Sequence, residues 1–166
     1  LDGAIDQLNK ADKLSFLNPM PEGKLVPALK SRVWLLQGRT PEAIAWVSQQ
    51  GLSIDDELTY EREYEHMTLA RVLIALSEGS QQSFKSKDES AQQAITLLNR
   101  LLEAAEAGGR RRHVIEILNL LARAHASRGD GPSSQTELKR ALALAEPEGY
   151  IRLFVDEGKP LATLLH

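Results

Sequence analysis

The sequence of 166 residues contains no cysteine, which excludes disulfides, thiolate nucleophiles and cysteine-ligated metal sites. Aromatic residues make up only 5%, and runs that alternate apolar and polar residues are hard to find, so we expect no β-sheet. Long apolar runs are also missing, since one of the longest, residues 68–76, is interrupted by Arg71. It is far shorter than the roughly 20 residues that span a bilayer, so we expect no membrane contact.

The residues that are abundant favour helices, because Leu, Ala, Glu, Gln and Arg are good helix formers. Hydrophobic residues make up 42% of the chain, enough for the core of one domain. The net charge of −3 provides no positive field, so we expect no direct contact with nucleic acid. The chain opens at Leu1 without an apolar leader. We therefore expect a single helical-repeat domain over residues 1–166, part of a larger cytoplasmic protein.

Glycine and proline divide the sequence into segments of about one helix each, in which apolar residues recur every three to four positions. We predict helices over residues 4–14, 26–37, 41–50, 58–77, 90–107, 112–127, 134–145 and 150–157, with a terminal turn from residue 160. Gly38 is expected to cap the second helix, and Thr40 to be the N-cap of the third, before Pro41. Residues 78–89 have no helical pattern and are predicted to form a loop.

The apolar stripes identify the faces that we expect to be buried. They include Leu29, Val33 and Leu36 in the second helix, Ala43, Ile44, Trp46 and Val47 in the third, and Tyr60, Tyr64 and Met67 in the fourth. Six helices pair as hairpins, the second with the third, the fourth with the fifth, and the sixth with the seventh. This order predicts an all-α fold, an irregular stacked α-hairpin solenoid of about eight or nine helices.

The third hairpin resembles a tetratricopeptide repeat in the spacing of its small and apolar residues. The matching residues are Leu118, Leu121, Ala122, Gly129, Leu138, Ala141 and Pro147. His125 and Ser134 depart from the usual pattern. The resemblance implies a tetratricopeptide-like solenoid with a right-handed superhelix. Gly38, Gly79 and Gly129 are further apart than the repeat unit of roughly 34 residues, with a stretched connection after Gly79, so we expect irregular repeats.

A closer resemblance lies in three blocks, WLLQGR at residues 34–39, DELTYEREYEHMTLARVL at residues 56–73 and RALALAEPEGYIRLFVDEG at residues 140–158. They are similar to the repeat domain of the MalT-like branch of LuxR-family transcription regulators. The resemblance implies a parent protein with an ATPase domain upstream and a DNA-binding helix-turn-helix domain downstream. This chain has neither a phosphate-binding loop nor a DNA-reading helix, so we expect no cofactor in it.

Two polar stripes are candidate binding sites for an effector or partner, if the first helices of the hairpins line a concave face. One stripe, on the helix over residues 112–127, consists of Glu116, Asn119, Arg123 and Ser127. Its alternative interpretation is a solvated helix face, which every amphipathic helix has.

The other stripe, on the helix over residues 58–77, contains Glu61, Glu65 and Thr68, in a charged segment with Arg62 and Glu63. The acidic residues there have an equally good alternative explanation, because they favour the dipole at a helix N-terminus.

Several other residues have two interpretations. Trp34 and Trp46 are either hairpin core, which we favour, or a platform for a ligand. The arginines at residues 110–112 either form a solvated helix start or meet an acidic surface of a neighbour.

Catalytic and metal-binding patterns are missing from the sequence. The four histidines lack metal-ligand spacing, and no serine lies in a nucleophile elbow, so we expect neither a metal site nor an enzyme.

Together these features predict a sensor and transmission domain that binds a small-molecule inducer or a protein along its concave face, with possible self-association. The alternative is a generic tetratricopeptide-type adaptor for protein–protein interactions. The flanking sequence of the parent gene would distinguish the two.

Overall fold

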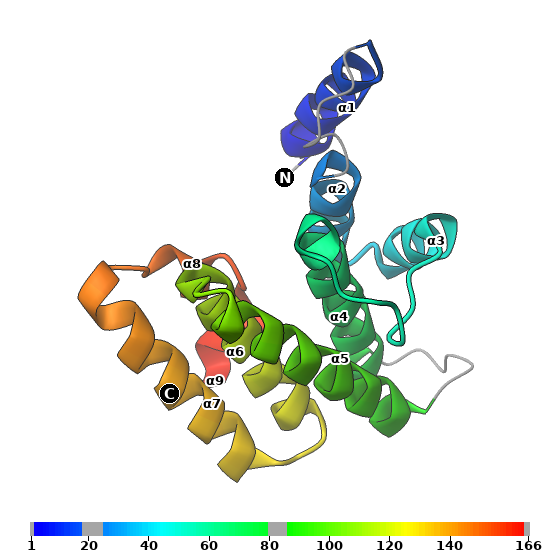
Figure 1. Cartoon of the computed structure of the whole chain (residues 1–166). Helices are drawn as coiled ribbons and strands as arrows, with labels where there is room; N and C mark the ends of the chain where they lie inside the picture. The colour runs from blue at the N-terminus through cyan, green and yellow to red at the C-terminus, as the bar shows by residue number, and fades with distance from the viewer. Residues whose placement is uncertain (1, 18–24, 80–85, 165–166) are drawn as a thin grey trace.

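The computed structural model describes residues 2–17, 25–79 and 86–164, and no strand occurs among them (Figure 1). The α-helices are α1 Asp2–Leu17, α2 Leu25–Leu36, α3 Thr40–Gln50, α4 Glu63–Glu78, α5 Lys87–Ala107, α6 Arg111–Ser127, α7 Gly131–Ala145, α8 Arg152–Val155 and α9 Lys159–Leu164. Two 3-10 turns, η2 Tyr60–Arg62 and η3 Glu146–Glu148, precede α4 and follow α7. The predicted all-α, tetratricopeptide-like solenoid is confirmed.

The three predicted hairpins form, because α2 packs on α3, α4 on α5, and α6 on α7. Their first helices are also neighbours, since α2 contacts α4 and α4 contacts α6. The chain then turns back, so that α8 and α9 lie against α6 (Figure 1). We call the side formed by α2, α4 and α6, against which the segment after α7 folds, the inner face.

The turns inside the outer two hairpins explain why glycine stands there. Gly38 and Gly129 have φ values of 74° and 78°, a left-handed conformation that other residues rarely adopt. The next amide closes each helix, from Arg39 to the carbonyl of Trp34 at 2.8 Å and from Asp130 to that of His125 at 3.0 Å. Gly79 has an extended backbone instead, as expected for the stretched connection of the middle hairpin.

Some helix ends differ from the prediction. Helix α3 begins at Thr40 itself, so the N-cap is Arg39 and the assignment of Thr40 was wrong by one residue. Helix α5 begins earlier than expected, because the Ser86 side chain accepts a hydrogen bond from the amide of Glu89 at 3.1 Å and caps it. The predicted loop therefore does not extend over residues 87–89, and residues 80–85 lie outside the described part of the chain.

The apolar core lies between α4, α5, α6 and α7, with contributions from α8 and α9. It contains large, fully buried side chains such as Met67, Ile74, Leu98 and Ile117, packed with small ones such as Ala141. The first hairpin contributes none of the fully buried residues of this core, and only partly buried residues of α3 and its following loop pack against it, namely Val47, Leu52, Ile54 and Leu58.

The buried faces of α2 and α4 differ from the sequence prediction. Helix α2 buries Ala28 and Ser31, whereas Leu29 and Val33 are half-buried and Leu36 is 47% exposed. Small residues let α2 approach α4 closely, and its larger apolar residues line the inner face instead. Tyr60, predicted in the buried stripe, is 70% exposed because the chain forms a 3-10 turn there and α4 starts later. Ile44 is also exposed.

The two tryptophans have different environments. Trp46 is buried in the first hairpin, as favoured. Trp34 is half-buried, with the ammonium of Lys30 5.6 Å and the guanidinium of Arg39 5.9 Å from its ring centre.

Candidate functional site

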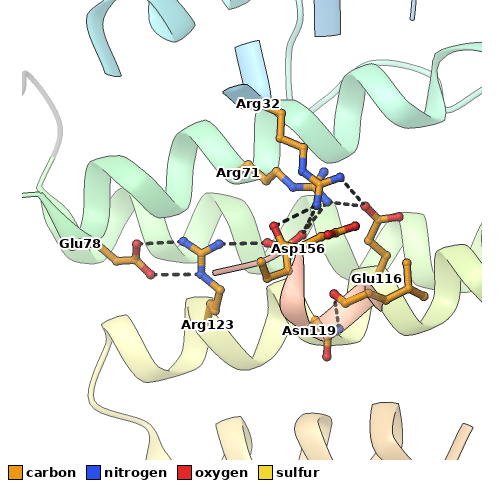
Figure 2. Close-up of polar contacts among 9 residues, drawn as sticks. Arg32, Arg71, Glu78, Glu116, Asn119, Arg123 and Asp156 are labelled. Carbon is orange, nitrogen blue, oxygen red and sulfur yellow. Dashed lines mark hydrogen bonds and ion pairs between the residues drawn. The ribbon is translucent and has the colours of Figure 1, made fainter. Parts of the chain in front are cut away.

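Three arginines, one from the first helix of each hairpin, meet on the inner face (Figure 2). All three donate hydrogen bonds to the carboxylate of Glu157, just after α8. Arg71 of α4 donates to Glu157 Oε1 at 2.9 Å, and Arg32 of α2 donates to the same oxygen at 3.3 Å. Arg123 of α6 donates to Oε2 at 3.1 Å. One carboxylate thus joins three hairpins that are distant in sequence.

Two further carboxylates complete this group. Glu116 of α6 accepts hydrogen bonds from Arg71 at 2.6 Å and from Arg32 at 3.4 Å. Glu78 at the end of α4 accepts two from Arg123, at 3.0 and 3.4 Å. We call these six residues, Arg32, Arg71, Arg123, Glu78, Glu116 and Glu157, the inner-face ion cluster. Its three positive and three negative charges balance, as burial requires.

The backbone around α8 is hydrogen-bonded to side chains of the inner face. Arg32 donates to the carbonyl of Asp156 at 3.3 Å, and the side-chain amide of Asn119 donates to that of Leu153 at 3.4 Å. Leu153 and Phe154 are buried in the core. Residues 150–164, which we call the internal segment, therefore lie on the inner face. They are anchored by apolar side chains and by Glu157.

Burial and charge oppose each other in the cluster. Only 3% of Arg71 and 3% of Glu157 is exposed. Burial by itself would raise the pKa of Glu157, but Arg71, Arg32 and Arg123 outweigh it, and the pKa lies below its usual 4.5. Burial likewise would lower the pKa of Arg71, but Glu157 and Glu116 keep it above its usual value. Both groups are therefore charged at neutral pH.

Two grooves border the cluster. The first groove, of about 540 Å³, is lined by Leu25, Leu29, Arg32, Tyr60, Glu61, Tyr64, Glu65, Arg112, His113 and Glu116. The second groove, of about 810 Å³, lies between α2, the end of α4 and the segment from Val155 to Pro160. Arg71, Arg123 and Glu157 line the second groove, and Arg32 lines both.

The structure brings most of the predicted α6 stripe into this site. Glu116 and Arg123 belong to the cluster, and Asn119 holds the backbone of α8. Ser127 lies further along, where it accepts a hydrogen bond from Ser77 at 2.9 Å. Glu116 and Asn119 are buried, so the alternative of a solvated face is wrong for these two residues, whereas Arg123 and Ser127 are partly exposed. The sequence did not predict this burial, because the residues that cover the stripe follow α7 and are not adjacent to it in the chain.

The predicted stripe on α4 divides between different environments. Glu61 and Glu65 line the first groove, and Glu65 accepts a hydrogen bond from Arg62 at 2.7 Å. Glu65 is therefore a partner for the positive charge of Arg62, which the dipole explanation for the acidic residues does not cover. Thr68 is buried and donates to the carbonyl of Tyr64 within its own helix at 2.8 Å, and it lines neither groove.

Of the arginines at residues 110–112, Arg110 pairs with an acidic residue of the same chain. Arg110 Nε lies 2.8 Å from Glu63 Oε2, and His113 Nδ1 lies 3.1 Å from Glu63 Oε1. The guanidinium of Arg110 also lies 5.5 Å from the ring centre of Tyr60. Arg110 thus meets the acidic start of α4, and Arg112 lines the first groove.

Sequence reasoning missed Arg32, Glu78 and Glu157 as site residues. Arg71 carried a usable signal, because a charge inside an apolar run of a buried helix requires a partner. The sequence did not say which carboxylate that partner is. Glu157 follows a helix of only four residues, Arg152–Val155, and its burial depends on the fold.

Two searches of the described residues bear on function classes. They contain no group of three or more His, Cys, Asp or Glu side chains placed to hold a metal ion. No helix among them is both long and apolar enough to cross a bilayer.

Comparison with known proteins gave one match. The family model described as the MalT-like TPR region matches residues 1–166, the whole chain. Neither the curated proteins nor the solved structures yield a significant match. Tetratricopeptide-like repeats are generally non-catalytic and interact with proteins or ligands. The model spans every hairpin and the segment that covers the inner face, so the chain belongs to the MalT-like TPR region family.

Proposed function

We propose that this chain is the sensor and transmission domain of a LuxR-family transcription regulator, and that it recognises an inducer or a protein partner on its inner face. The observation that supports this most is the inner-face ion cluster, which joins all three hairpins and the segment after α7 beside two open grooves. A ligand in either groove would touch side chains that set how the hairpins are arranged.

The mechanism would be a population shift, in which the ligand binds one arrangement of the hairpins better than another. Arg32 is well placed for it, because it lines both grooves and pairs with both Glu116 and Glu157. In the parent protein, located in the cytoplasm, the shift would act on ATP-dependent self-association and DNA binding. ATP binding and DNA binding would belong to other domains of the parent, and self-association would involve this one.

The first groove offers the mixed chemistry that a polar effector needs. Tyr60 and Tyr64 present aromatic faces, and Glu61, Arg112 and His113 supply charged and hydrogen-bonding groups. Because Tyr60 is exposed, its ring can contact a ligand without disturbing the core.

A thermal-shift screen of the chain against common metabolites, oligosaccharides and helical peptides tests the proposal. A ligand at a hundredfold excess over its dissociation constant stabilises the folded state by about 2.7 kcal/mol. At roughly 2–4 °C per kcal/mol, the melting temperature would rise by several degrees. We expect Tyr60→Ala combined with Glu61→Gln to abolish the shift.

The matched control is Glu103→Gln, which removes an exposed carboxylate on α5, away from both grooves. It should leave the shift unchanged. If no small molecule gives a shift and only peptides do, the adaptor alternative replaces the sensor. A shift that persists in the groove variant would contradict the assignment of the first groove.

A further inference from the structure

We propose that Arg32, Arg71 and Arg123 form a carboxylate-binding site, which is filled by Glu157 of the same chain. An acidic peptide segment of a partner binds there by displacing the internal segment. This inference rests on the proposed function, because it names a ligand class for the same inner face. The carboxylate of the partner would take the place of the Glu157 carboxylate.

The charges of the cluster require an anion at this position. When Glu157 leaves, three guanidinium groups face only the carboxylates of Glu116 and Glu78. A net positive charge at a buried site is costly, so the open form attracts a replacement anion. Arginine can donate two parallel hydrogen bonds to a carboxylate, so three guanidiniums around one position favour a carboxylate.

Arg71 also has donors to spare. Its Nε and Nη1 are buried and find no hydrogen-bond acceptor among the described residues, although the side chain is 97% buried. Both oxygens of an incoming carboxylate could accept hydrogen bonds from these donors, which do not bond to Glu157. Unused buried donors of this kind are uncommon in folded proteins and indicate a site suited to a further ligand.

The second groove explains why the carboxylate should belong to a peptide. Beside the arginines, it is lined by the apolar side chains of Val33, Leu35, Leu36 and Ala75. A peptide that carries an acidic residue between apolar ones would fill both parts of this surface. The internal segment has that composition, with Val155 before Asp156 and Glu157.

The internal segment is built to be displaced. It holds two helices of only four and six residues, α8 and α9, which are too short to be stable by themselves. Its anchors are Leu153, Phe154 and Leu161 in the core, Glu157 in the cluster, and two backbone carbonyls that accept hydrogen bonds from Arg32 and Asn119. Ile151 and Val155 of the same segment are 73% and 68% exposed. Local opening of such segments costs less than global unfolding.

A binding assay with a synthetic peptide of residues 150–164 tests the proposal. The labelled peptide is titrated with the whole chain, either unchanged or carrying Glu157→Gln, and its fluorescence anisotropy is measured. The internal segment competes at a high effective concentration, so removal of its carboxylate should tighten peptide binding by about tenfold or more. A peptide with glutamine at the position of Glu157 should bind the variant about tenfold more weakly.

Asp156→Asn is the matched control, because it removes the same charge from an exposed neighbouring side chain. We expect it to bind the peptide like the unchanged chain. The double variant with Glu157→Gln and Arg71→Gln should not show the tighter peptide binding that Glu157→Gln alone produces. The proposal is overturned if Glu157→Gln binds no better than Asp156→Asn, or if it binds the glutamate and glutamine peptides equally.

A second measurement keeps the test decisive if Glu157→Gln does not fold. Hydrogen exchange of residues 151–158 in the unchanged chain should become faster with the glutamate peptide and not with the glutamine peptide. Equal exchange with both peptides would overturn the proposal. Such a failure would leave the thermal-shift response standing, since that response depends on Tyr60 and Glu61, so the two proposals fail separately.

Discussion

The first hairpin and the last two are held in the solenoid by different forces. Helices α4 to α7 share one apolar core, in which Met67, Leu98 and Ile117 are fully buried. Hairpin α2–α3 contributes no fully buried residue to that core and is tied to the inner face by Arg32, through Glu116 and Glu157. Apolar burial is insensitive to a nearby charge, whereas ion pairs respond to ligands, salt and pH.

This difference separates a rigid part from an adjustable one. The block from α4 to α7 keeps its shape, because removing any of its close-packed side chains leaves a cavity. The segment after α7 also has apolar anchors in the core, but six charged side chains that a ligand can reach from two grooves join it to α2. A sensor needs both, a fixed frame and an element whose position a ligand can change.

The largest effect is expected in the apolar block. Ala141→Arg places a charge at a fully buried position between α6 and α7 and should destabilise the fold by roughly 3–5 kcal/mol. The free energy of unfolding from urea denaturation measures it. Ala143→Arg, the same change at an exposed position of α7, is the control and should have little effect. Equal stability of both variants would refute the described packing of this hairpin.

A smaller and more local effect is expected for the first hairpin. Arg32→Gln removes its ion pairs with Glu116 and Glu157 and should cost about 1–2 kcal/mol. Hydrogen exchange should become faster in α2 and unchanged in α7. Glu42→Gln, which removes an exposed pair with Arg39 inside the same hairpin, should leave exchange in α2 unaltered. Uniformly faster exchange in both helices would contradict the division into two parts.

The smallest effect is expected from pH. The pKa of Glu157 is lowered in the folded chain, so its stabilising contribution is complete above the usual pKa of 4.5 and is lost as the pH falls through the lower, folded value. The segment around α8 should therefore lose protection from hydrogen exchange in acid, relative to the intrinsic exchange rate at each pH, before the block from α4 to α7 unfolds. Glu157→Gln should remove this pH dependence. If the variant kept it, another carboxylate would control the segment.

The sequence predicted the helices well because their signals are local. Apolar spacing and the stops at Gly38 and Gly129 place helix ends within a few residues and show which helices pair. The errors at Thr40 and Ser86 concern caps, where neighbouring residues compete for the same amides. The larger error, the buried face of α2, arose because periodicity shows which residues are apolar and not what covers them. Leu36 lines a groove because no helix packs over it.

The candidate site was only partly accessible to sequence reasoning. Glu116, Asn119 and Arg123 could be named because they share one face of a helix. Whether that face is solvated or covered depends on contacts between residues far apart in the chain. Arg71 and Glu157 are separated by 86 positions, and Arg32 and Glu157 by 125.

The sequence by itself determined the helical class, the hairpin order and the family resemblance, since each depends on neighbours within one or two helical turns or on contiguous blocks. Only the tertiary structure decided that the segment after α7 folds onto the inner face and that Glu157 meets three arginines there. The physical reason is that a buried charge is stable only beside its partner, and the partner is selected by how the hairpins stack in space.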